Sequence, residues 1–205
     1  MSSVVIIDSG TSNLFSIQNA LNSVGAKTKI TSSKMDIEKA DFLILPGVGS
    51  FSQAMVNLNK KKIVHPILRH IKEKKPFLGI CLGFQLLFEY SYEFKKTKGL
   101  SLLKGDVREF SNDKVNTVPH VGWNSTKVLN NKYNFIKNQD FYYFVHSFYV
   151  LPKNKKRIYT TTKVDNFSFC SSIIKNNIFG CQFHPEKSGK QGLKFLKNFL
   201  KFKHA

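Results

Sequence analysis

The stretch Pro76-Phe77-Leu78-Gly79-Ile80-Cys81-Leu82-Gly83 decides how this chain folds around its chemistry. It begins as a short apolar run and ends with a thiol between two glycines, after which residues 84–90 carry helical spacing. Strand, sharp turn and helix with a nucleophile at the turn is the pattern of a nucleophile elbow, written G-x-S-x-G when the nucleophile is serine. The turn brings neighbouring segments of the backbone so close together that we expect a Cβ at Gly79 or Gly83 to clash.

Cys81 is the residue that this pattern singles out. A thiol at the start of a helix lies near backbone N–H groups and the positive end of the helix dipole, which favour the nucleophilic thiolate. A buried structural cysteine is an equally good interpretation of the pentapeptide alone, because free cysteine is among the most buried residue types. The choice depends on whether a base is available elsewhere in the chain.

A candidate base lies about a hundred residues later, in Phe183-His184-Pro185-Glu186. Proline biases the residue before it toward extended backbone, in which residues two apart point the same way, so we expect Glu186 beside His184. A carboxylate in that place fixes the tautomer of the imidazole and stabilises the imidazolium. The sequence therefore predicts Cys81 as nucleophile, His184 as base and Glu186 as the group that orients the base.

Composition predicts one domain over residues 1–205, since 205 residues with 41% hydrophobic content can bury one core. The chain has no apolar run of the roughly 18 residues that a membrane span needs, and no basic segment precedes the strand-like residues 4–7. The three cysteines are too few and odd in number for a disulfide framework. We therefore expect a cytoplasmic protein with no membrane partner and no signal peptide.

The net charge of +19 suggests a nucleic-acid partner at first sight. The lysines are scattered, however, and no zinc-finger or RNA-recognition signature accompanies them. An acidic protein partner or plain solvation explains such a charge as well. We expect no nucleic-acid partner.

The first half of the chain alternates strands and helices. Strands are predicted at 4–8, 27–30, 42–45 and 77–80, and helices at 14–24, 50–58 and 63–74. Short strands separated by helices favour a parallel sheet with helices on both faces, in which ligands bind beyond the carboxyl ends of the strands. We expect Cys81 and the turn Pro46-Gly47-Val48-Gly49 to share that edge.

The second half is mostly strand-like. Strands are predicted at 116–118, 141–150, 157–164 and 167–183, and a closing amphipathic helix at 189–203. Lys175-Asn176-Asn177 is a turn signal that makes the last strand-like run a hairpin. The fold class predicted is therefore α/β, with a mixed, mostly parallel central sheet flanked by helices.

The loop Pro46-Gly47-Val48-Gly49-Ser50-Phe51 exposes backbone N–H groups that could receive the oxyanion of a tetrahedral intermediate. The amide of Leu82, immediately after the nucleophile, would be the second donor. An ordinary strand-to-helix loop is the alternative. A phosphate-binding loop is excluded because no Gly-Lys-Ser/Thr follows.

Together these residues resemble a family. Gly79-Ile80-Cys81-Leu82-Gly83-Phe84-Gln85 and Gln182-Phe183-His184-Pro185-Glu186 resemble the two signatures of class I, triad-type glutamine amidotransferases. Four more segments resemble the glutaminase subunits of imidazole glycerol phosphate synthases: Asp8-Ser9-Gly10 with Asn13-Leu14, the loop 46–51, Pro119-His120-Val121-Gly122-Trp123-Asn124, and Tyr143-Phe144-Val145-His146-Ser147-Phe148-Tyr149. The matches run from near residue 4 to near residue 200. Ser9 and Ser12 depart from the tyrosine and glycine usual there, in a region that lies near the partner interface in that family.

The resemblance implies a flavodoxin-like architecture and hydrolysis of glutamine to glutamate and ammonia by Cys81, His184 and Glu186. It implies that backbone amides near Val48, Gly49 and Leu82 hold the oxyanion. Gln85 and the backbone of Ser147 and Phe148 would hold the α-amino and α-carboxylate groups of glutamine. No metal and no organic cofactor are implied.

The resemblance also implies a partner. Ammonia would pass into a (β/α)8-barrel cyclase subunit, which forms imidazole glycerol phosphate and an aminoimidazole ribonucleotide in histidine biosynthesis. Asn13, His120, Trp123 and Asn124 are assigned by resemblance to the partner face or to gating. From the residues alone, a lone tryptophan is more often in a core, and His120 after a proline is more often structural.

Three alternatives stay open. A paralogous glutaminase subunit that supplies ammonia to another acceptor, such as a surface-sugar precursor, would share every catalytic residue. A cysteine hydrolase or peptidase of related fold would act without a partner and would not prefer free glutamine. A non-enzymatic binding module would have an unreactive Cys81.

Overall fold

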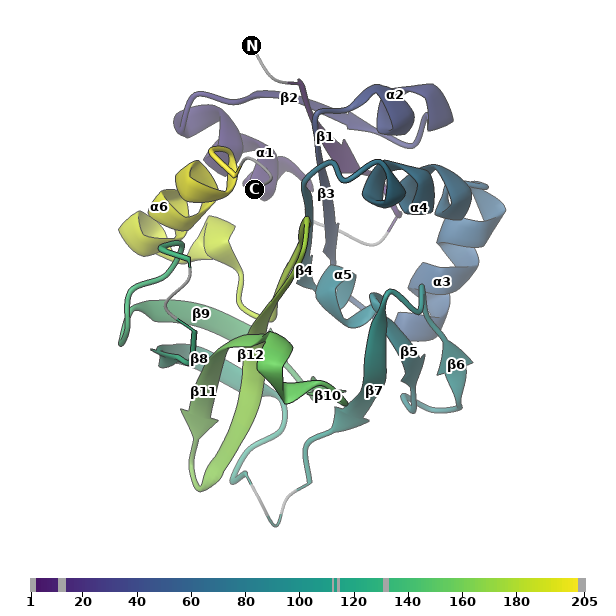
Figure 1. Cartoon of the computed structure of the whole chain (residues 1–205). Helices are drawn as coiled ribbons and strands as arrows, with labels where there is room; N and C mark the ends of the chain where they lie inside the picture. Colours follow the sequence, from purple (N-terminus) through teal and green to yellow (C-terminus); the bar gives the residue numbers. More distant parts are fainter. Residues whose placement is uncertain (1–2, 11–13, 112, 114, 131–132, 203–205) are drawn as a thin grey trace.

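The computed structural model describes residues 3–10, 14–111, 113, 115–130 and 133–202. In this part of the chain 13 strands join into one sheet with helices on both sides (Figure 1). The sheet has two parts that differ in strand direction. The first half of the chain builds most of one part, and the second half builds most of the other.

The parallel part has the order β2-β1-β3-β4-β13. Its strands are β2 (Lys27–Thr31), β1 (Ser3–Ile7), β3 (Phe42–Gly47), β4 (Phe77–Cys81) and β13 (Ile178–Cys181). Each of the four strands predicted in the first half of the chain is present here, within one or two residues at either end. Val-, Ile- and Leu-rich runs are expected in strands that helices cover on both faces.

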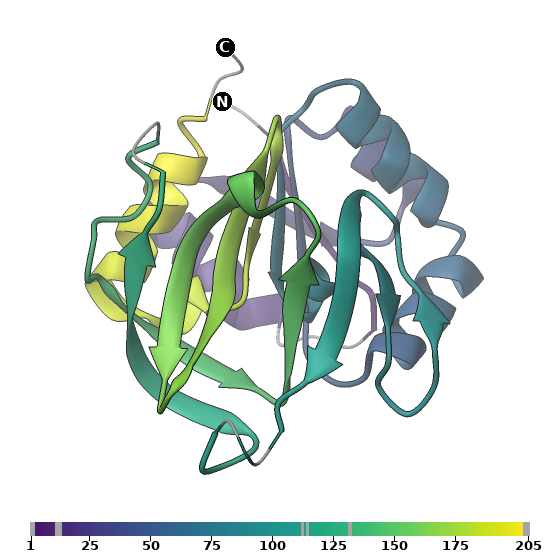
Figure 2. The same ribbon diagram turned by 60° about the horizontal axis from the view of Figure 1, so that its bottom comes forward.

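The antiparallel part continues from β13 in the order β12-β10-β7-β5-β6, in which only the β5–β7 pair is parallel. Its strands are β12 (Phe167–Lys175), β10 (Phe148–Pro152), β7 (Leu103–Glu109), β5 (Phe88–Ser91) and β6 (Thr97–Lys98). Three further strands branch from β12 in the order β11-β8-β9. They are β11 (Ile158–Val164), β8 (His120–Val128) and β9 (Phe141–His146), and Figure 2 shows them curling away from the main sheet.

Helices cover the parallel part on both faces, as predicted. On one side lie α1 (Leu14–Ser23) and α6 (Gly189–Phe199); on the other lie α2 (Lys34–Lys39), α3 (Phe51–Lys60) and α4 (Val64–Lys72) (Figure 1). The core is accordingly divided in two. Val4 and Ile6 of β1 pack into the cluster that contains α1 and α6, whereas Val5 and Ile7 pack into the cluster that contains α3 and α4. This alternation is the two-residue period of a strand buried on both faces.

The helix predicted after the elbow is wrong in length. Spacing in residues 84–90 predicts helix, but α5 is a single turn, Leu82–Gln85, and the chain is already in β5 by Phe88. The carbonyls of Leu86 and Leu87 accept hydrogen bonds from the backbone of residues 100, 102 and 103. Pairing with this distant segment, together with burial of residues 84–88, outweighs the local helical preference.

The second half shows which strand boundaries the sequence could place. The run 167–183 is the hairpin β12–β13 with its turn at Asn176 and Asn177, as predicted. Residues 116–118 are not a strand, and β8 instead begins at His120, beyond Pro119. The run 141–150 breaks at Ser147 into β9 and β10, which pair with different neighbours. The sequence predicts neither helix α2 nor strands β5, β6, β7 and β8.

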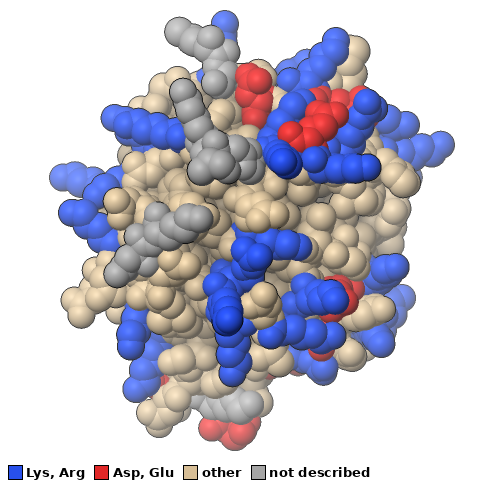
Figure 3. All heavy atoms as spheres, in the orientation of Figure 1, with Lys and Arg blue, Asp and Glu red and all other residues tan. Residues whose placement is uncertain are grey.

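Lys and Arg side chains are spread over the face shown in Figure 3, with Asp and Glu at a few places among them. Several lysines of this kind are paired with acids, as Lys61 is with Asp8 and Lys153 with Glu89. No helix in the described ranges is both long enough and apolar enough to cross a membrane.

Candidate active site

Three chain segments meet at the carboxyl edge of the parallel strands. Gly47 at the end of β3 pairs in register with Cys81 at the end of β4, and β13 on the other side of β4 pairs Cys181 with Ile80. The loop after β3, the elbow after β4 and the segment after β13 therefore converge. This is the edge on which the sequence predicts the site to lie.

The elbow at Cys81 is strained and tightly packed. Cys81 has φ 53° and ψ −111°, a conformation that a residue with a side chain rarely adopts. A Cβ on Gly83 would lie 1.8 Å from the carbonyl oxygen of Leu45, and one on Gly79 would lie 2.7 Å from the carbonyl oxygen of Gly83. Both expected clashes are confirmed, and the glycines are what let β3, β4 and α5 approach so closely.

The thiol of Cys81 lies against polar groups from remote strands. Its sulfur accepts a hydrogen bond from Gln182 Nε2 at 3.5 Å, and it lies 3.9 Å from the carbonyl oxygen of Val145. Only 6% of the residue is exposed. Gln182 is itself held by Gln85, whose Nε2 donates to Gln182 Oε1 at 3.1 Å.

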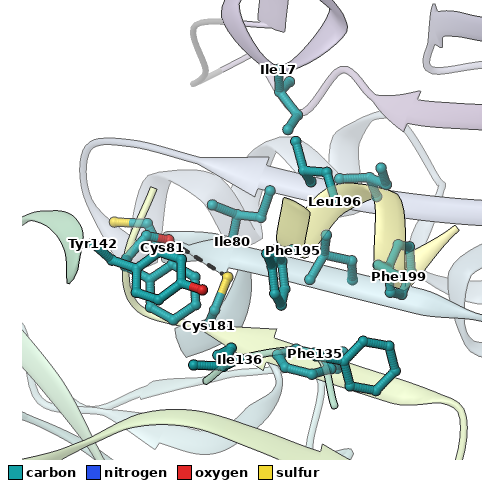
Figure 4. Packing of buried hydrophobic residues seen from close by; sticks show 14 of the residues in the cluster. Ile17, Ile80, Cys81, Phe135, Ile136, Tyr142, Cys181, Phe195, Leu196 and Phe199 are labelled. Carbon is teal, nitrogen blue, oxygen red and sulfur yellow. Dashed lines mark hydrogen bonds between the residues drawn. The ribbon is translucent and has the colours of Figure 1, made fainter. Parts of the chain in front are cut away.

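The other two cysteines differ from Cys81. Cys170 and Cys181 are free thiols in the core, as the sequence suggests for small residues on strand-like runs. Burial raises the pKa of both, so they stay protonated. Figure 4 shows Cys81 and Cys181 toward one end of the apolar cluster that α6 completes.

His184 is held beside Glu186. The backbone of His184 is extended, with φ −98° and ψ 96°, as the following proline predicts. Its Nδ1 lies 2.8 Å from Glu186 Oε1, and both side chains are buried. The expected pairing is present, although Glu186 lies in the 3₁₀ turn Pro185–Lys187 and not in extended backbone.

Two residues anchor the backbone of His184 from outside the motif. Its N–H donates to the carbonyl oxygen of Tyr143 in β9, and its own carbonyl accepts from Ser188 Oγ at 2.6 Å. The same Oγ accepts from the N–H of Tyr143 at 3.0 Å. The imidazole is therefore fixed by the sheet as well as by Glu186.

The surroundings of His184 favour the imidazolium. Burial acts to lower its pKa, but the charge of Cys81, a hydrogen bond with the sulfur and the Glu186 carboxylate together raise the pKa to about 10. Apart from that interaction with sulfur, Nε2 is buried without a hydrogen-bond partner in the described part of the chain. A thiol, an imidazole and a carboxylate thus form one coupled unit that can attack an acyl group and protonate what leaves.

A cavity of about 200 Å³ opens beside Cys81. All six residues that the sequence predicts for the oxyanion and for glutamine line it: Val48, Gly49, Leu82, Gln85, Ser147 and Phe148. Three residues for which the sequence predicts no role also line it: Glu93, Val145 and His146. Larger grooves of about 460 to 490 Å³ lie elsewhere on the surface, but none of them contains the thiol. We therefore assign the site to the smaller cavity on its chemistry.

Glu93 is the residue of the cavity that sequence reasoning missed most plainly. It lies in the loop after β5, and its carboxylate accepts a hydrogen bond from the N–H of Phe51 at the start of α3. Burial raises its pKa, the bond from Phe51 lowers it, and nearby Glu109 raises it further. No motif marks Glu93 in the sequence, because its place beside Cys81 depends on the long-range pairing of β5.

The residues assigned to a partner face divide into two groups. Trp123 is 52% exposed, which contradicts the interpretation of a lone tryptophan as core, and its ring contacts that of Tyr143. The Nζ atom of Lys187 lies over the Tyr143 ring, 5.8 Å from the ring centre. These three side chains form a surface next to Glu186.

His120 does not belong to that surface. It is 5% exposed, so the part of the prediction that places it on a partner face is wrong: aromatic rings of the core surround it. Asn124 is half-buried and bonded to it. Asn13 and Ser12 lie outside the described residues, and Ser9 is buried.

No group of three or more His, Cys, Asp or Glu side chains in the described residues is arranged to hold a metal ion. The polar side chains that line the cavity are instead the thiol of Cys81, the amide of Gln85, the carboxylate of Glu93, the imidazole of His146 and the hydroxyl of Ser147. Such a set suits a small zwitterionic molecule with an acyl group toward the thiol.

Comparison with known proteins agrees with the geometry. The family model for class I glutamine amidotransferases matches residues 5–202. Imidazole glycerol phosphate synthase subunit HisH of Caldanaerobacter subterraneus subsp. tengcongensis is 50% identical over 196 residues, which are 95% of each chain. Imidazole glycerol phosphate synthase hisHF of Schizosaccharomyces pombe is 42% identical over 206 residues, which cover 96% of this chain and 38% of that longer protein.

Among solved structures, PurLQS from Thermotoga maritima superposes with a TM-score of 0.78 at 21% identity, over 98% of this chain and 99% of that one. At that identity the likeness bears on the fold alone. It confirms the predicted α/β fold class.

Proposed function

The chain belongs to the class I glutamine amidotransferases, as a glutaminase subunit of the imidazole glycerol phosphate synthase type, and we propose that it hydrolyses glutamine with a Cys81–His184–Glu186 triad. Membership makes it a glutamine amidotransferase of histidine biosynthesis. The residue roles are the proposal, and the observation that carries them is the strained thiol coupled to a buried His–Glu pair at the mouth of a cavity.

In the first half-reaction, the Cys81 sulfur attacks the side-chain amide carbon of glutamine, and the carbonyl oxygen becomes an oxyanion. Backbone N–H groups near Val48, Gly49 and Leu82 would receive that charge. The imidazolium of His184 donates its proton to the amide nitrogen, the C–N bond breaks, and ammonia leaves a glutamyl thioester.

In the second half-reaction, His184 is neutral and takes a proton from water, which attacks the thioester carbon. The C–S bond breaks, glutamate leaves and the thiolate–imidazolium pair is restored. Glu186 keeps Nδ1 protonated throughout, so Nε2 is the nitrogen that exchanges protons.

The cavity supports recognition of the amino-acid end of glutamine. Gln85 at the end of α5 and the Ser147–Phe148 backbone between β9 and β10 line the cavity and would hold the α-carboxylate and α-amino groups. Glu93 supplies the carboxylate that an α-ammonium group requires. An acyl substrate without an α-ammonium group would leave this half-buried carboxylate without a counter-charge.

The proposal includes a partner that receives the ammonia, a (β/α)8-barrel cyclase subunit. The relative HisH is by its name one subunit of a synthase, which supports a second subunit. The S. pombe protein hisHF extends well beyond the region that matches this chain, which leaves room for such a second part within one polypeptide. The exposed surface of Trp123, Tyr143 and Lys187 adjoins Glu186 and would contact the partner. A paralogous subunit feeding a different acceptor would keep every catalytic residue, but the relatives give it no support.

The test is glutamate formation from glutamine, measured with the chain alone and with the organism's barrel subunit plus its ribulosyl substrate. We expect low activity alone and strong stimulation in the complex. Cys81→Ala should abolish activity, whereas Cys170→Ala, a change at a core thiol outside the site, should leave kcat/KM unchanged. Full residual activity in the Cys81→Ala variant would refute the triad.

A further inference from the structure

A pair of histidines lies at the wall of the cavity, and the triad does not use it. His146 and His120 come from the neighbouring strands β9 and β8, where they pair in register. His120 Nδ1 lies 3.1 Å from His146 Nε2, and both residues are about 95% buried. Phe110, Phe144 and Phe169 enclose the two rings.

The pair connects the wall of the cavity to the outer part of strand β8. At one end, His146 Nδ1 lies 2.8 Å from the carbonyl oxygen of Phe148. At the other end, His120 Nε2 lies 2.8 Å from Asn124 Oδ1, and Asn124 Nδ2 donates to the carbonyl oxygen of Lys163. The chain of contacts therefore runs from a residue that lines the cavity to a half-buried residue next to exposed Trp123.

The hydrogen-bond chemistry fixes which nitrogen of His146 carries the proton. The carbonyl of Phe148 can only accept, so Nδ1 of His146 donates and its Nε2 is left as an acceptor for His120. Burial lowers the pKa of His146 to about 3, and the nearby His120 and His184 act in the same direction, so the ring is neutral. A neutral ring with Nδ1 protonated needs a donor at Nε2, and His120 is that donor.

Two proton arrangements of the chain satisfy this requirement. In the first, Asn124 Oδ1 points toward His120, so His120 donates from both ring nitrogens and is positively charged. Burial opposes this charge, and the carboxylate of Asp165 favours it. With the Asn124 amide turned, its NH2 group donates to a neutral His120 and the bond to Lys163 is lost. In both arrangements His120 donates to His146, and His146 donates to Phe148.

The carbonyl of Phe148, to which His146 donates, is contacted by more than one residue of the cavity. Phe148 oxygen also accepts from Gln85 Nε2 at 3.0 Å, and the preceding carbonyl, that of Ser147, accepts from the N–H of Phe110. The two hydrogen bonds to Phe148 oxygen fix both the Ser147–Phe148 backbone and the side chain of Gln85. Without the bond from His146, this carbonyl keeps only the donor Gln85 and is held less firmly, and small misplacements at a binding site are costly.

We propose that His146 is a positioning residue for glutamine binding, held in its Nδ1-protonated tautomer by His120, and that Asn124 ties this pair to strand β8. The proposal rests on the glutaminase function above for its kinetic consequence, but not for the tautomer. It assigns His120 an indirect role from within the core. Neither histidine exchanges a proton with the substrate.

The first test is ¹⁵N NMR of the imidazole nitrogens in the full chain, which separates protonated from unprotonated ring nitrogens. We expect His146 to be Nδ1-protonated and uncharged from pH 5 to pH 8. In His120→Phe, which keeps an aromatic ring among the three phenylalanines, Nε2 of His146 loses its donor and becomes a buried, unpaired acceptor. That cost offsets the preference that the Phe148 carbonyl gives to a protonated Nδ1, so we expect a mixture of tautomers at His146. An unchanged single tautomer in that variant would overturn the proposal, whether or not the protein hydrolyses glutamine.

The second test is the glutaminase kinetics of the complex. His120→Phe and His146→Leu should raise KM for glutamine about tenfold with kcat changed less than about threefold, because a binding group is displaced and the triad is not. His146→Asn, whose amide nitrogen replaces Nδ1 as donor, should recover most of the loss. His146→Gln, which replaces Nε2 instead, should not.

His70→Phe is the matched control, because His70 is a fully buried histidine bonded to the carbonyl of Pro76, away from the cavity. It should lower the melting temperature as His120→Phe does while leaving KM unchanged. Equal effects of the two variants on KM would refute the positioning role. If His120→Phe does not fold, His120→Asn is measured by the same two methods.

Discussion

Two buried histidines lie near the thiol of Cys81, and their surroundings drive them to opposite charge states. His184 faces a carboxylate and a thiol, and its pKa is raised to about 10. His146 faces a carbonyl and another imidazole among phenylalanine rings, and its pKa is lowered to about 3. Both residues are nearly inaccessible to water.

The contrast teaches that burial alone does not decide what a histidine does. Burial lowers the pKa of both rings, but only His184 has negative groups that overcome it. A charged, coupled ring can transfer protons, whereas a neutral ring with both nitrogens engaged can only position what it touches. The predictions below test this comparison, from the largest expected effect to the smallest.

Removing the thiol should change His184 most. In Cys81→Ala we expect glutamine hydrolysis to fall roughly 10⁵-fold or more, since the nucleophile of a coupled triad is lost. The pKa of His184 should fall as well, because Cys81 is the largest contribution that raises it. NMR titration of His184 measures the shift, and that of His70, a buried histidine that does not line the cavity, is the internal control.

Neutralising the carboxylate should be milder. Glu186→Gln should lower kcat roughly 10³- to 10⁴-fold, because His184 survives but loses both its orientation and the charge that stabilises the imidazolium. Steady-state kinetics of the complex give the value. A loss as complete as that of Cys81→Ala would mean that Glu186 does more than orient the base.

Glu93→Gln separates binding from chemistry within the same cavity. We expect KM for glutamine to rise about tenfold or more with kcat nearly unchanged, because the carboxylate opposite the α-ammonium group is lost. An equal rise for 4-carbamoylbutanoate, the glutamine analogue without the α-amino group, would contradict the assignment.

The two histidines should change the free energy of unfolding with pH in opposite directions, His184 on the alkaline side and His146 on the acid side. His184 binds its proton more tightly when folded, so its contribution is complete below pH 6.5 and is lost as the pH rises from 6.5 to about 10. His146 binds its proton less tightly when folded, so stability falls as the pH drops from 6.5 toward 3. Each contributes a slope of at most about 1.4 kcal/mol per pH unit.

Urea unfolding at a series of pH values measures both slopes. His184→Gln should flatten the alkaline side of the curve and His146→Leu the acid side. A variant that changes the wrong side, or neither, would contradict the charge state assigned to that histidine.

The sequence predicted the parallel part of the sheet well and the antiparallel part poorly. Strands such as Phe77–Cys81 are apolar runs closed by glycine or proline, and that signal is local. The segment 84–90 has helical spacing, yet it divides between the short α5 and β5, because its backbone bonds to residues 100–103. Pairing partners across such distances leave no mark within the segment itself.

The candidate site divides in the same way. Cys81, His184 and Glu186 were predicted from two short motifs, since an elbow needs flanking glycines and an orienting carboxylate lies two residues from its histidine. Glu93, Gln182 and His146 were given no role, although each borders the thiol or its cavity. For His120 the resemblance implies the partner face or gating, whereas the residue type alone favours a structural role, and the side chain lies inside.

The sequence by itself determined the chemistry of this protein: a thiol on a strained turn, a histidine in extended backbone, and an acid that follows it. These depend on covalent neighbours, which a short motif specifies completely. Only the tertiary structure decided the charge of each histidine and the walls of the cavity. Both depend on groups that folding brings together from distant parts of the chain, such as Gln182 and Cys81, which are 101 positions apart. The solvation and the charge of a side chain are set by the groups that surround it in space.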